Sequence, residues 1–250
     1  MPPSPPPSHD ADAADLIRRY GHLDGAALLR AVAHEVFPGR LAVVSSFGTE
    51  SAVLLALVAE ADPAIPVLFL DTGKMFGETL RYRDTLTAHL GLTDVRTIRP
   101  DPADLGADAD GLLFQRDADA CCHIRKTLPL ERALGGFDAW ITGRKRFQSS
   151  TRAALPLFEA DAGRIKLNPL ATWDRARLDE EFARRALPRH PLEEDGFLSI
   201  GCYTCTERVA PGADPRSGRW AGQAKTECGI HVSRIPSPTA PASAPASLDA

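Results

Sequence analysis

Short apolar runs, separated by polar turns, mark the central part of the chain. Residues 41–46 and 66–70 read Leu-Ala-Val-Val-Ser-Ser and Pro-Val-Leu-Phe-Leu. Their apolar positions follow one another without polar alternation, which is typical of strands that are covered on both faces. Two further runs, 94–99 and 139–142, predict a third and a fourth strand.

Helical segments are expected between these strands. One covers about 50–61, and a second ends near Leu90, where Gly91 occupies the position after a helix that favours glycine. Further helices are expected over 125–134 and 174–187. The alternation predicts an α/β fold with a mostly parallel twisted sheet and helices on both faces, in which ligands lie beyond the carboxyl ends of the strands.

Composition and charge exclude several classes of protein. The 250 residues are 44% hydrophobic and 25% charged, the ordinary mix of a soluble globular chain. The formal net charge of −4 argues against a nucleic-acid-coating protein, whose affinity depends on neutralised phosphates. Because no apolar run approaches the ~20 residues of a membrane span and the N-terminus lacks a secretory signal, we expect a cytoplasmic protein that binds no membrane.

The five cysteines form two pairs and a single residue: Cys121-Cys122, a C-x-x-C motif of Cys202 and Cys205, and Cys228. In a reducing compartment such clusters usually bind metal or catalyse. Adjacent cysteine side chains diverge, which suits a polynuclear iron–sulfur cluster better than one tetrahedral ion, so a 4Fe–4S cluster is preferred over structural zinc. A redox dithiol and cysteines packed as small apolar side chains stay as alternatives.

The turn over residues 45–51, Ser-Ser-Phe-Gly-Thr-Glu-Ser, ends the first predicted strand and opens a helix. Hydroxyls and free backbone N–H groups at a helix N-terminus can bind an anion, and Gly48 would let a phosphate approach the backbone. The turn matches neither a Walker A nor a G-x-G-x-x-G motif. A plain turn with a serine or threonine N-cap is the alternative.

Basic residues gather at two places in this acidic chain. Residues 143–152 follow the fourth predicted strand and carry four cations, and Arg216 and Arg219 precede Cys228. Arginine forks match phosphate and sulfate oxygens, so an anionic small molecule is favoured over a solvated basic face. Lys126, just after the tandem cysteines, is either a cation beside a thiolate cluster or a solvated helix residue.

The single cysteine lies in the stretch Glu-Cys-Gly-Ile-His that ends at His231. We expect Cys228 to be exposed and reactive, because a histidine three residues on could lower the pKa of the thiol or donate a proton. An incidental surface thiol is the alternative.

Together these motifs resemble the assimilatory adenylylsulfate and phosphoadenylylsulfate reductases. The matching pieces run in order over about residues 40–231: Ser45-Ser-Phe-Gly48, Leu70-Asp-Thr-Gly73, Glu78-Thr79, Cys121-Cys-x-x-Arg-Lys126, Gly143-x-x-Arg146-x-Gln148-Ser149, Lys166-x-Asn-Pro-Leu170, Gly196-Phe-Leu-Ser-Ile-Gly201, Cys202-x-x-Cys205, Gly218-Arg-Trp220 and Glu227-Cys-Gly-Ile-His231.

The resemblance implies an adenine-nucleotide α-hydrolase-like fold, related to the ATP pyrophosphatases. Members with both paired-cysteine motifs hold one 4Fe–4S cluster and generally prefer adenylylsulfate, so Cys121, Cys122, Cys202 and Cys205 would be the ligands, with Lys126 nearby. The implied substrate-binding residues are Ser45, Ser46, Phe47, Gly48, Thr49, Leu70, Asp71, Thr72, Gly73, Gly143, Arg144, Arg152, Arg216, Arg219 and His231.

The implied reaction is the reduction of adenylylsulfate (APS) to sulfite and AMP in sulfate assimilation and cysteine biosynthesis. Cys228 would attack the sulfur and form an S-sulfocysteine, from which a thioredoxin or glutaredoxin would release sulfite. A reductase of phosphoadenylylsulfate (PAPS), or of both nucleotides, is the nearest alternative. More distant ones are an ATP pyrophosphatase-type enzyme, a sulfate adenylyltransferase subunit and a zinc-stabilised nucleotide sensor.

The expected domain organisation follows from these assignments. Five prolines crowd positions 2–7, and the other end is rich in Pro, Ala and Ser, so disordered tails are expected over 1–12 and 234–250. Between them we expect one nucleotide- and cluster-binding domain over 13–220 and a mobile catalytic segment over 221–233. The sequence leaves room for a homo-oligomer.

Overall fold

A computed structural model describes residues 9–222, 225 and 227–231. Both predicted tails lie outside the described residues, except that the first helix begins at His9, inside the predicted N-terminal tail.

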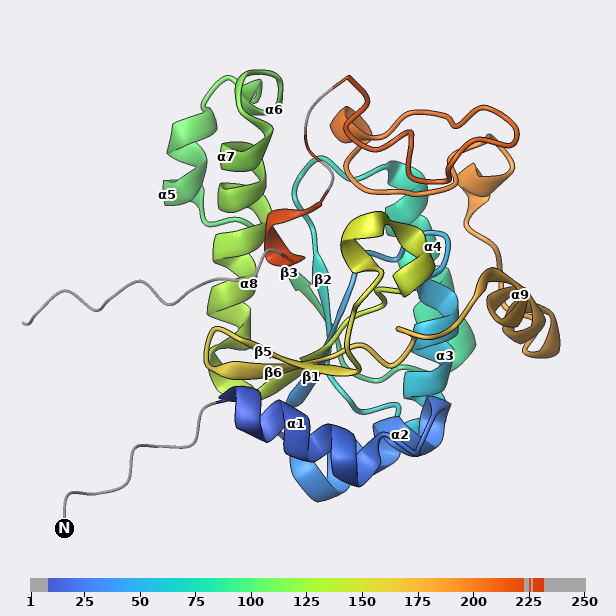
Figure 1. Ribbon diagram of the computed structural model, residues 1–250. Coiled ribbons are helices and arrows are strands. Elements are labelled where there is room, and N and C mark those ends of the chain that lie inside the picture. Colours follow the sequence, from blue (N-terminus) through green and yellow to red (C-terminus); the bar gives the residue numbers. More distant parts are fainter. Residues whose placement is uncertain (1–8, 223–224, 226, 232–250) are drawn as a thin grey trace, which may run out of the picture.

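The described residues form a six-stranded sheet in the order β3-β2-β1-β4-β6-β5. Every pair in it is parallel except β5–β6. This confirms the predicted mostly parallel sheet with helices on both faces (Figure 1). The strands are β1 (Leu41–Ser45), β2 (Val67–Leu70), β3 (Val95–Ile98), β4 (Ala139–Ile141), β5 (Phe158–Asp161) and β6 (Arg164–Leu167).

Helices cover the sheet, and one lies in each of the four ranges that the sequence predicts. Gly91 ends α4 in the left-handed conformation, with φ 66°. The α-helices are α1 (His9–Tyr20), α2 (Gly25–Ala31), α3 (Ser51–Ala61), α4 (Gly77–Leu90), α5 (Pro102–Leu105), α6 (Leu113–Arg116), α7 (Ala118–Cys122), α8 (Leu128–Ala133) and α9 (Arg175–Arg184).

The helix expected over 125–134 is divided. A π-helical turn (His123–Thr127) precedes α8, and a 3-10 turn (Leu134–Gly136) follows it. Pro129 lies at the start of α8 and has no N–H to donate to the preceding turn, which explains why the regular hydrogen-bond pattern changes there.

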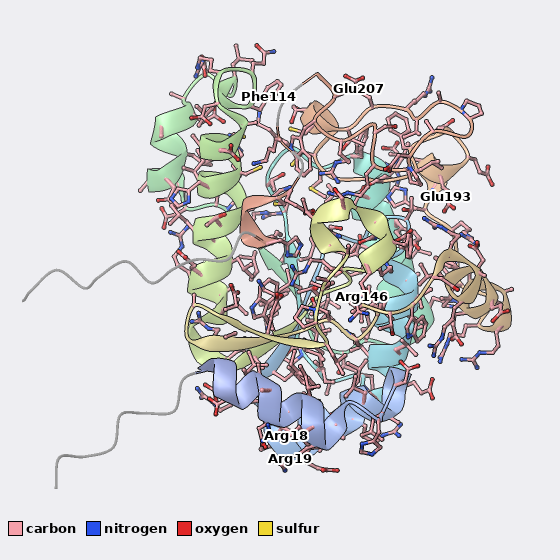
Figure 2. All side chains as sticks on the ribbon, viewed as in Figure 1. Arg18, Arg19, Phe114, Arg146, Glu193 and Glu207 are labelled. Carbon is pink, nitrogen blue, oxygen red and sulfur yellow. The ribbon has the colours of Figure 1, made fainter. Side chains whose placement is uncertain are left out.

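Two apolar clusters hold the sheet between its helices. Because successive side chains of a strand point to opposite faces, Leu41 and Val43 enter the larger cluster while Ala42 and Val44 enter the smaller one. α3 is buried along most of its length in the larger cluster. The segment around Glu207 lies at the same end of the molecule as Phe114 of α6, whereas Arg18 and Arg19 of α1 lie at the opposite end (Figure 2).

None of the described helices combines the length and the apolar character that crossing a membrane requires.

Candidate functional site

A cavity of about 390 Å³ opens beyond the carboxyl ends of β1, β2 and β4. It lies where the strand order reverses between β1 and β4, the position at which parallel α/β sheets usually bind ligands. Its lining brings together many of the residues singled out in the sequence: Ser45, Ser46, Gly48, Thr49, Leu70, Lys126, Gly143, Arg144, Arg152, Arg216, Arg219, Cys228 and His231.

The turn after β1 forms one side of this cavity. Ser46 is exposed, whereas the Ser45 hydroxyl accepts a hydrogen bond from the Phe47 N–H at 3.1 Å and the Thr49 hydroxyl donates to the Leu198 carbonyl at 2.9 Å. Phe47 is fully buried, and its ring meets the Phe69 ring edge-on at 5.5 Å. Phe47 therefore packs into the core behind the turn and does not line the cavity.

The turn after β2 faces the cysteines rather than the cavity. The Thr72 hydroxyl lies 3.2 Å from Cys202 Sγ, and the Thr72 carbonyl accepts a hydrogen bond from Arg125 at 2.8 Å. The Asp71 carboxylate accepts hydrogen bonds from Arg99 and from the Gly73 N–H, each at 3.1 Å. Of this predicted group, only Leu70 reaches the cavity lining.

Acidic side chains that the sequence analysis did not select hold several cations of the cavity in place. The Glu50 carboxylate pairs with Lys145 at 2.7 Å and with Arg175 at 2.5 Å. Burial alone would raise the pKa of Glu50, but these cations outweigh it and lower the pKa. Glu50 carries no motif of its own, so only the fold, which brings it to Lys145, could identify it.

Arg144 is buried in a second polar cluster at the end of β4. Its guanidinium pairs with Glu159 and lies 3.1 Å from the Asn168 side-chain oxygen. Burial, reinforced by the neighbouring Arg152, lowers the pKa of Arg144 to about 10. Arg144 therefore stays charged at neutral pH, and its charge is largely balanced by Glu159.

The segment that carries Cys228 lies beside the tandem cysteines. Its 3-10 turn (Gly229–His231) packs on the π-helical turn before α8, as the red segment next to α8 in Figure 1 shows. A hydrogen bond with Cys122 lowers the pKa of Cys228 against the opposing effect of burial, and the cations Lys126 and Arg219 lower it further. The structure thus favours a thiolate at Cys228.

His231 has a different environment from the one expected for a partner of the thiol. Its ring stacks on Trp140 with centroids 6.2 Å apart and an interplanar angle of 6°. Burial lowers the pKa of His231, and Arg144 and Arg152 lower it further. His231 is therefore neutral at physiological pH, and the cations that favour the Cys228 thiolate are Lys126 and Arg219.

The two pairs of cysteines lie near each other in the structure, although none of the four lines the cavity. Cys202 and Cys205 lie close enough to Cys121 to contribute to the raised pKa of that thiol, which burial raises first. Lys126 is half-buried and lies near the thiols of Cys202, Cys228 and Cys122, whose charges raise its pKa against the opposing effect of desolvation. Over the described ranges, no three Cys, His, Asp or Glu side chains converge closely enough to share one metal ion.

Two buried N–H groups beside the C-x-x-C motif have no acceptor among the described residues: Arg219 Nε and Trp220 Nε1. The Trp220 backbone N–H donates to the Cys205 carbonyl at 3.1 Å, which places the indole next to this motif. Buried donors without partners are costly, so they indicate that an acceptor belongs here. Sulfur atoms of a cluster or oxygens of an anion would meet that need.

Comparisons with known proteins point to one family and to a shared fold. A model of the phosphoadenosine phosphosulfate reductase domain matches residues 40–208. An adenosine 5'-phosphosulfate reductase of Mesorhizobium japonicum is 54% identical over 90% of this chain and 89% of its own, and one of a Chelativorans species is 49% identical over 89% and 92%. The crystal structure of phosphoadenylyl-sulfate reductase from Candida auris, a phosphate complex, aligns with a TM-score of 0.67 at 25% identity, covering 83% of this chain and 100% of that one.

Proposed function

The chain belongs to the phosphoadenosine phosphosulfate reductase family, and from this membership we propose that it reduces APS to sulfite and AMP in sulfate assimilation. One observation of the structure supports this proposal. The Cys228 thiol lies in the cavity at the carboxyl ends of the strands, beside the cations Lys126 and Arg219. A thiolate next to cations that can hold an anionic sulfate is the arrangement that this reaction needs.

We propose that the phosphosulfate of the nucleotide lies between the turn after β1 and the arginines of the C-terminal segment. Ser45, Ser46, Gly48 and Thr49 would border its phosphate at the N-terminus of α3, and Arg216 and Arg219 would contact phosphate and sulfate oxygens. Arg144, Arg152 and Gly143 complete the wall at the end of β4, and Leu70 would border the nucleoside. Because His231 is neutral in this structure, we assign it a binding role and no proton transfer.

We propose that Cys121, Cys122, Cys202 and Cys205 hold one 4Fe–4S cluster. Each thiolate of such a cluster binds its own iron, so the four ligands need not converge on one point. The proximity of Cys121 to the C-x-x-C motif and the unpaired indole N–H of Trp220 support this fit. When bound, the cluster would join α7 to the C-x-x-C segment and present its charge to Lys126.

The reaction proceeds in three steps at Cys228. The thiolate attacks the sulfate sulfur, the bond from sulfur to the phosphate oxygen breaks, and AMP leaves while an S-sulfocysteine remains. A thiolate of the reductant, a thioredoxin or glutaredoxin, then attacks the Cys228 sulfur and displaces sulfite. The second thiol of the reductant resolves the mixed disulfide, so the dithiol supplies both electrons and Cys228 is regenerated. Lys126 and Arg219 reduce the repulsion between the anionic thiolate and the anionic sulfate.

Two measurements on the anaerobically purified chain test the proposal. Sulfite release from APS with a thioredoxin is expected, and faster release from PAPS would assign the chain to the second substrate instead. No sulfite from either nucleotide would contradict the function. About four irons and four sulfides per chain are expected, whereas zinc without sulfide would contradict the cluster. We also propose a cytoplasmic location, because a reducing compartment keeps such thiols and their reductants in the reduced form.

A further inference from the structure

Glu227, the residue before the proposed nucleophile Cys228, is held by Arg152, and both side chains line the cavity. Arg152 Nε and Nη2 donate to the two carboxylate oxygens of Glu227, each at 2.6 Å, in a two-pronged pair. Both side chains are largely buried, at 8% and 17% exposure. The hydroxyls of Ser149 and Thr151 add weaker contacts to the same carboxylate, at 3.4 and 3.3 Å.

This pairing occupies the donor groups of Arg152. Its third nitrogen, Nη1, donates to the side-chain oxygen of Gln148, so each guanidinium nitrogen has an acceptor within the protein. The two-pronged face of the Arg152 guanidinium is therefore occupied by Glu227 and is not open to a ligand in the cavity. Arg219, whose Nε lacks an acceptor among the described residues, is better placed to meet a substrate anion.

Cys228 lies between two fixed points of its segment. On one side Glu227, whose Cα is only ~3.8 Å from that of Cys228, is bound to Arg152. On the other side Gly229 lies so close to the Thr127 hydroxyl that an added Cβ would come within 3.2 Å of it, and His231 stacks on Trp140. Without the Glu227 contact, the next described anchor on the N-terminal side of Cys228 is Lys225, three residues away along the chain, which pairs with Asp119.

We infer that Glu227 is a positioning residue, which binds Arg152 and so seats the Cys228 thiol in the cavity beside Lys126 and Arg219. The inference rests on the proposed function for its catalytic consequence. The carboxylate is ionised when it does so, because Arg152 and Arg216 lower the pKa of Glu227 against the opposing effect of burial. Burial protects such a charged pair from screening and makes its loss costly.

The test compares Glu227→Gln with the matched control Glu180→Gln, which removes a carboxylate from an exposed position on α9. The first readout is the alkylation rate of Cys228, followed by peptide mass spectrometry without any nucleotide. We expect Glu227→Gln to raise this rate by about tenfold, the effect of one lost charge-assisted hydrogen bond, and Glu180→Gln to leave it unchanged. Arg152→Gln should give the same increase, and the double variant no more than either single one.

The second readout separates positioning from substrate binding. Glu227→Gln should lower kcat for sulfite release by about tenfold, with KM and AMP affinity unchanged, and Glu227→Asp should recover part of the loss. Unchanged alkylation would overturn the inference, as would tighter AMP binding by Glu227→Gln, which would show that Glu227 competes with the substrate anion. If the wild-type chain releases no sulfite, the proposed function fails, while the alkylation rates still decide whether Glu227 seats Cys228.

If Glu227→Gln unfolds, the exchanged pair Arg152→Glu with Glu227→Arg takes its place. Restored protection of Cys228 in this double variant would support the inference, and protection no better than in Arg152→Glu alone would overturn it.

Discussion

Two walls of the cavity are built by different forces. The sheet wall, which comprises β1, the turn 45–51 and α3, rests on the apolar core, where Phe47 and most of α3 are buried. The loop wall, residues 196–222 and 227–231, contains only short 3-10 turns and isolated bridges such as Thr206–Arg219. Its described residues are held mainly by backbone hydrogen bonds, ion pairs and ring stacking.

This difference matches the two demands of the proposed reaction. A nucleotide must be held in one position, which suits a wall fixed by close packing of the core. The thiol must meet the sulfate first and a protein reductant afterwards, which suits a wall whose contacts are individually modest and can be exchanged. We therefore expect substitutions in the sheet wall to affect stability and those in the loop wall to affect turnover.

The largest expected effect is on turnover, from Cys228→Ser in the loop wall. A serine hydroxyl is a far weaker nucleophile than a thiolate at neutral pH, so sulfite release should fall by at least about 10⁴-fold. AMP binding, iron content and thermal unfolding should match those of the wild type, because the change removes only one sulfur from a half-buried site. Retained turnover in a sulfite assay would exclude Cys228 as the nucleophile.

The next effect is on stability, from Phe47→Ala in the sheet wall. Deleting this fully buried ring removes its contact with Phe69 and leaves a cavity, at a cost of about 3–5 kcal/mol in the free energy of unfolding. The matched control is Phe147→Ala, because Phe147 is also a phenylalanine but is 43% exposed and lines the functional cavity. Urea unfolding should show little change for the control. A similar loss in both variants would exclude burial in the core as the cause of the effect.

The sheet wall could be predicted from the sequence because its strands carry their own signal. Uninterrupted apolar runs identified β1 and β2 to within a residue or two, and the parallel order then placed their carboxyl ends at one site. The hairpin of β5 and β6 was missed, although Ala162 and Gly163, both with positive φ, form the two-residue turn that joins such strands. Its strands are only four residues long and mix charged with apolar positions.

The loop wall could be predicted only as a set of motifs. Cysteine spacing and the Glu-Cys-Gly-Ile-His stretch indicated which residues carry chemistry, but not that Glu227 binds Arg152, 75 residues away along the chain. Such pairs depend on the path of irregular backbone, for which periodicity gives no information. The same limit applies to the turn Asp71–Gly73, which the resemblance assigned to the nucleotide and which here faces Cys202 through Thr72.

A smaller effect on stability is expected when the pH is lowered, through His190, which precedes the loop wall in the chain. His190 is fully buried, accepts a hydrogen bond from the Leu192 N–H at Nδ1 (3.2 Å) and bonds to the Thr79 hydroxyl at Nε2 (3.0 Å). Burial lowers the pKa of His190 from 6.5 to about 4, against an opposing effect of Glu78. The folded protein thus binds this proton less readily than the unfolded chain.

Stability from His190 should therefore be complete above pH 6.5 and be lost as the pH falls from 6.5 towards 4. The full loss is on the order of 3 kcal/mol, since each unit of pKa difference corresponds to about 1.4 kcal/mol. Urea unfolding between these pH values measures it. His190→Gln should flatten the dependence, whereas the control His89→Gln, at an exposed position of α4, should retain it. Equal slopes in both variants would exclude His190 as the cause.

The smallest expected effect comes from Gly201→Ala, a substitution in the loop wall that should leave the fold intact. A Cβ on Gly201 would lie 2.3 Å from Arg219 Nη2, so Gly201→Ala must displace this guanidinium, which is the end of a flexible side chain. We expect the free energy of unfolding to change by less than about 1 kcal/mol, while AMP affinity falls by about tenfold, the cost of a charge-assisted hydrogen bond to phosphate. Gly106→Ala, which has nothing within 4 Å of the added Cβ, is the control. Calorimetric titration with AMP decides between two outcomes: a selective loss of affinity places the Arg219 guanidinium on the nucleotide, whereas unchanged affinity with lower stability would mean that the loop wall, like the sheet wall, serves mainly the fold.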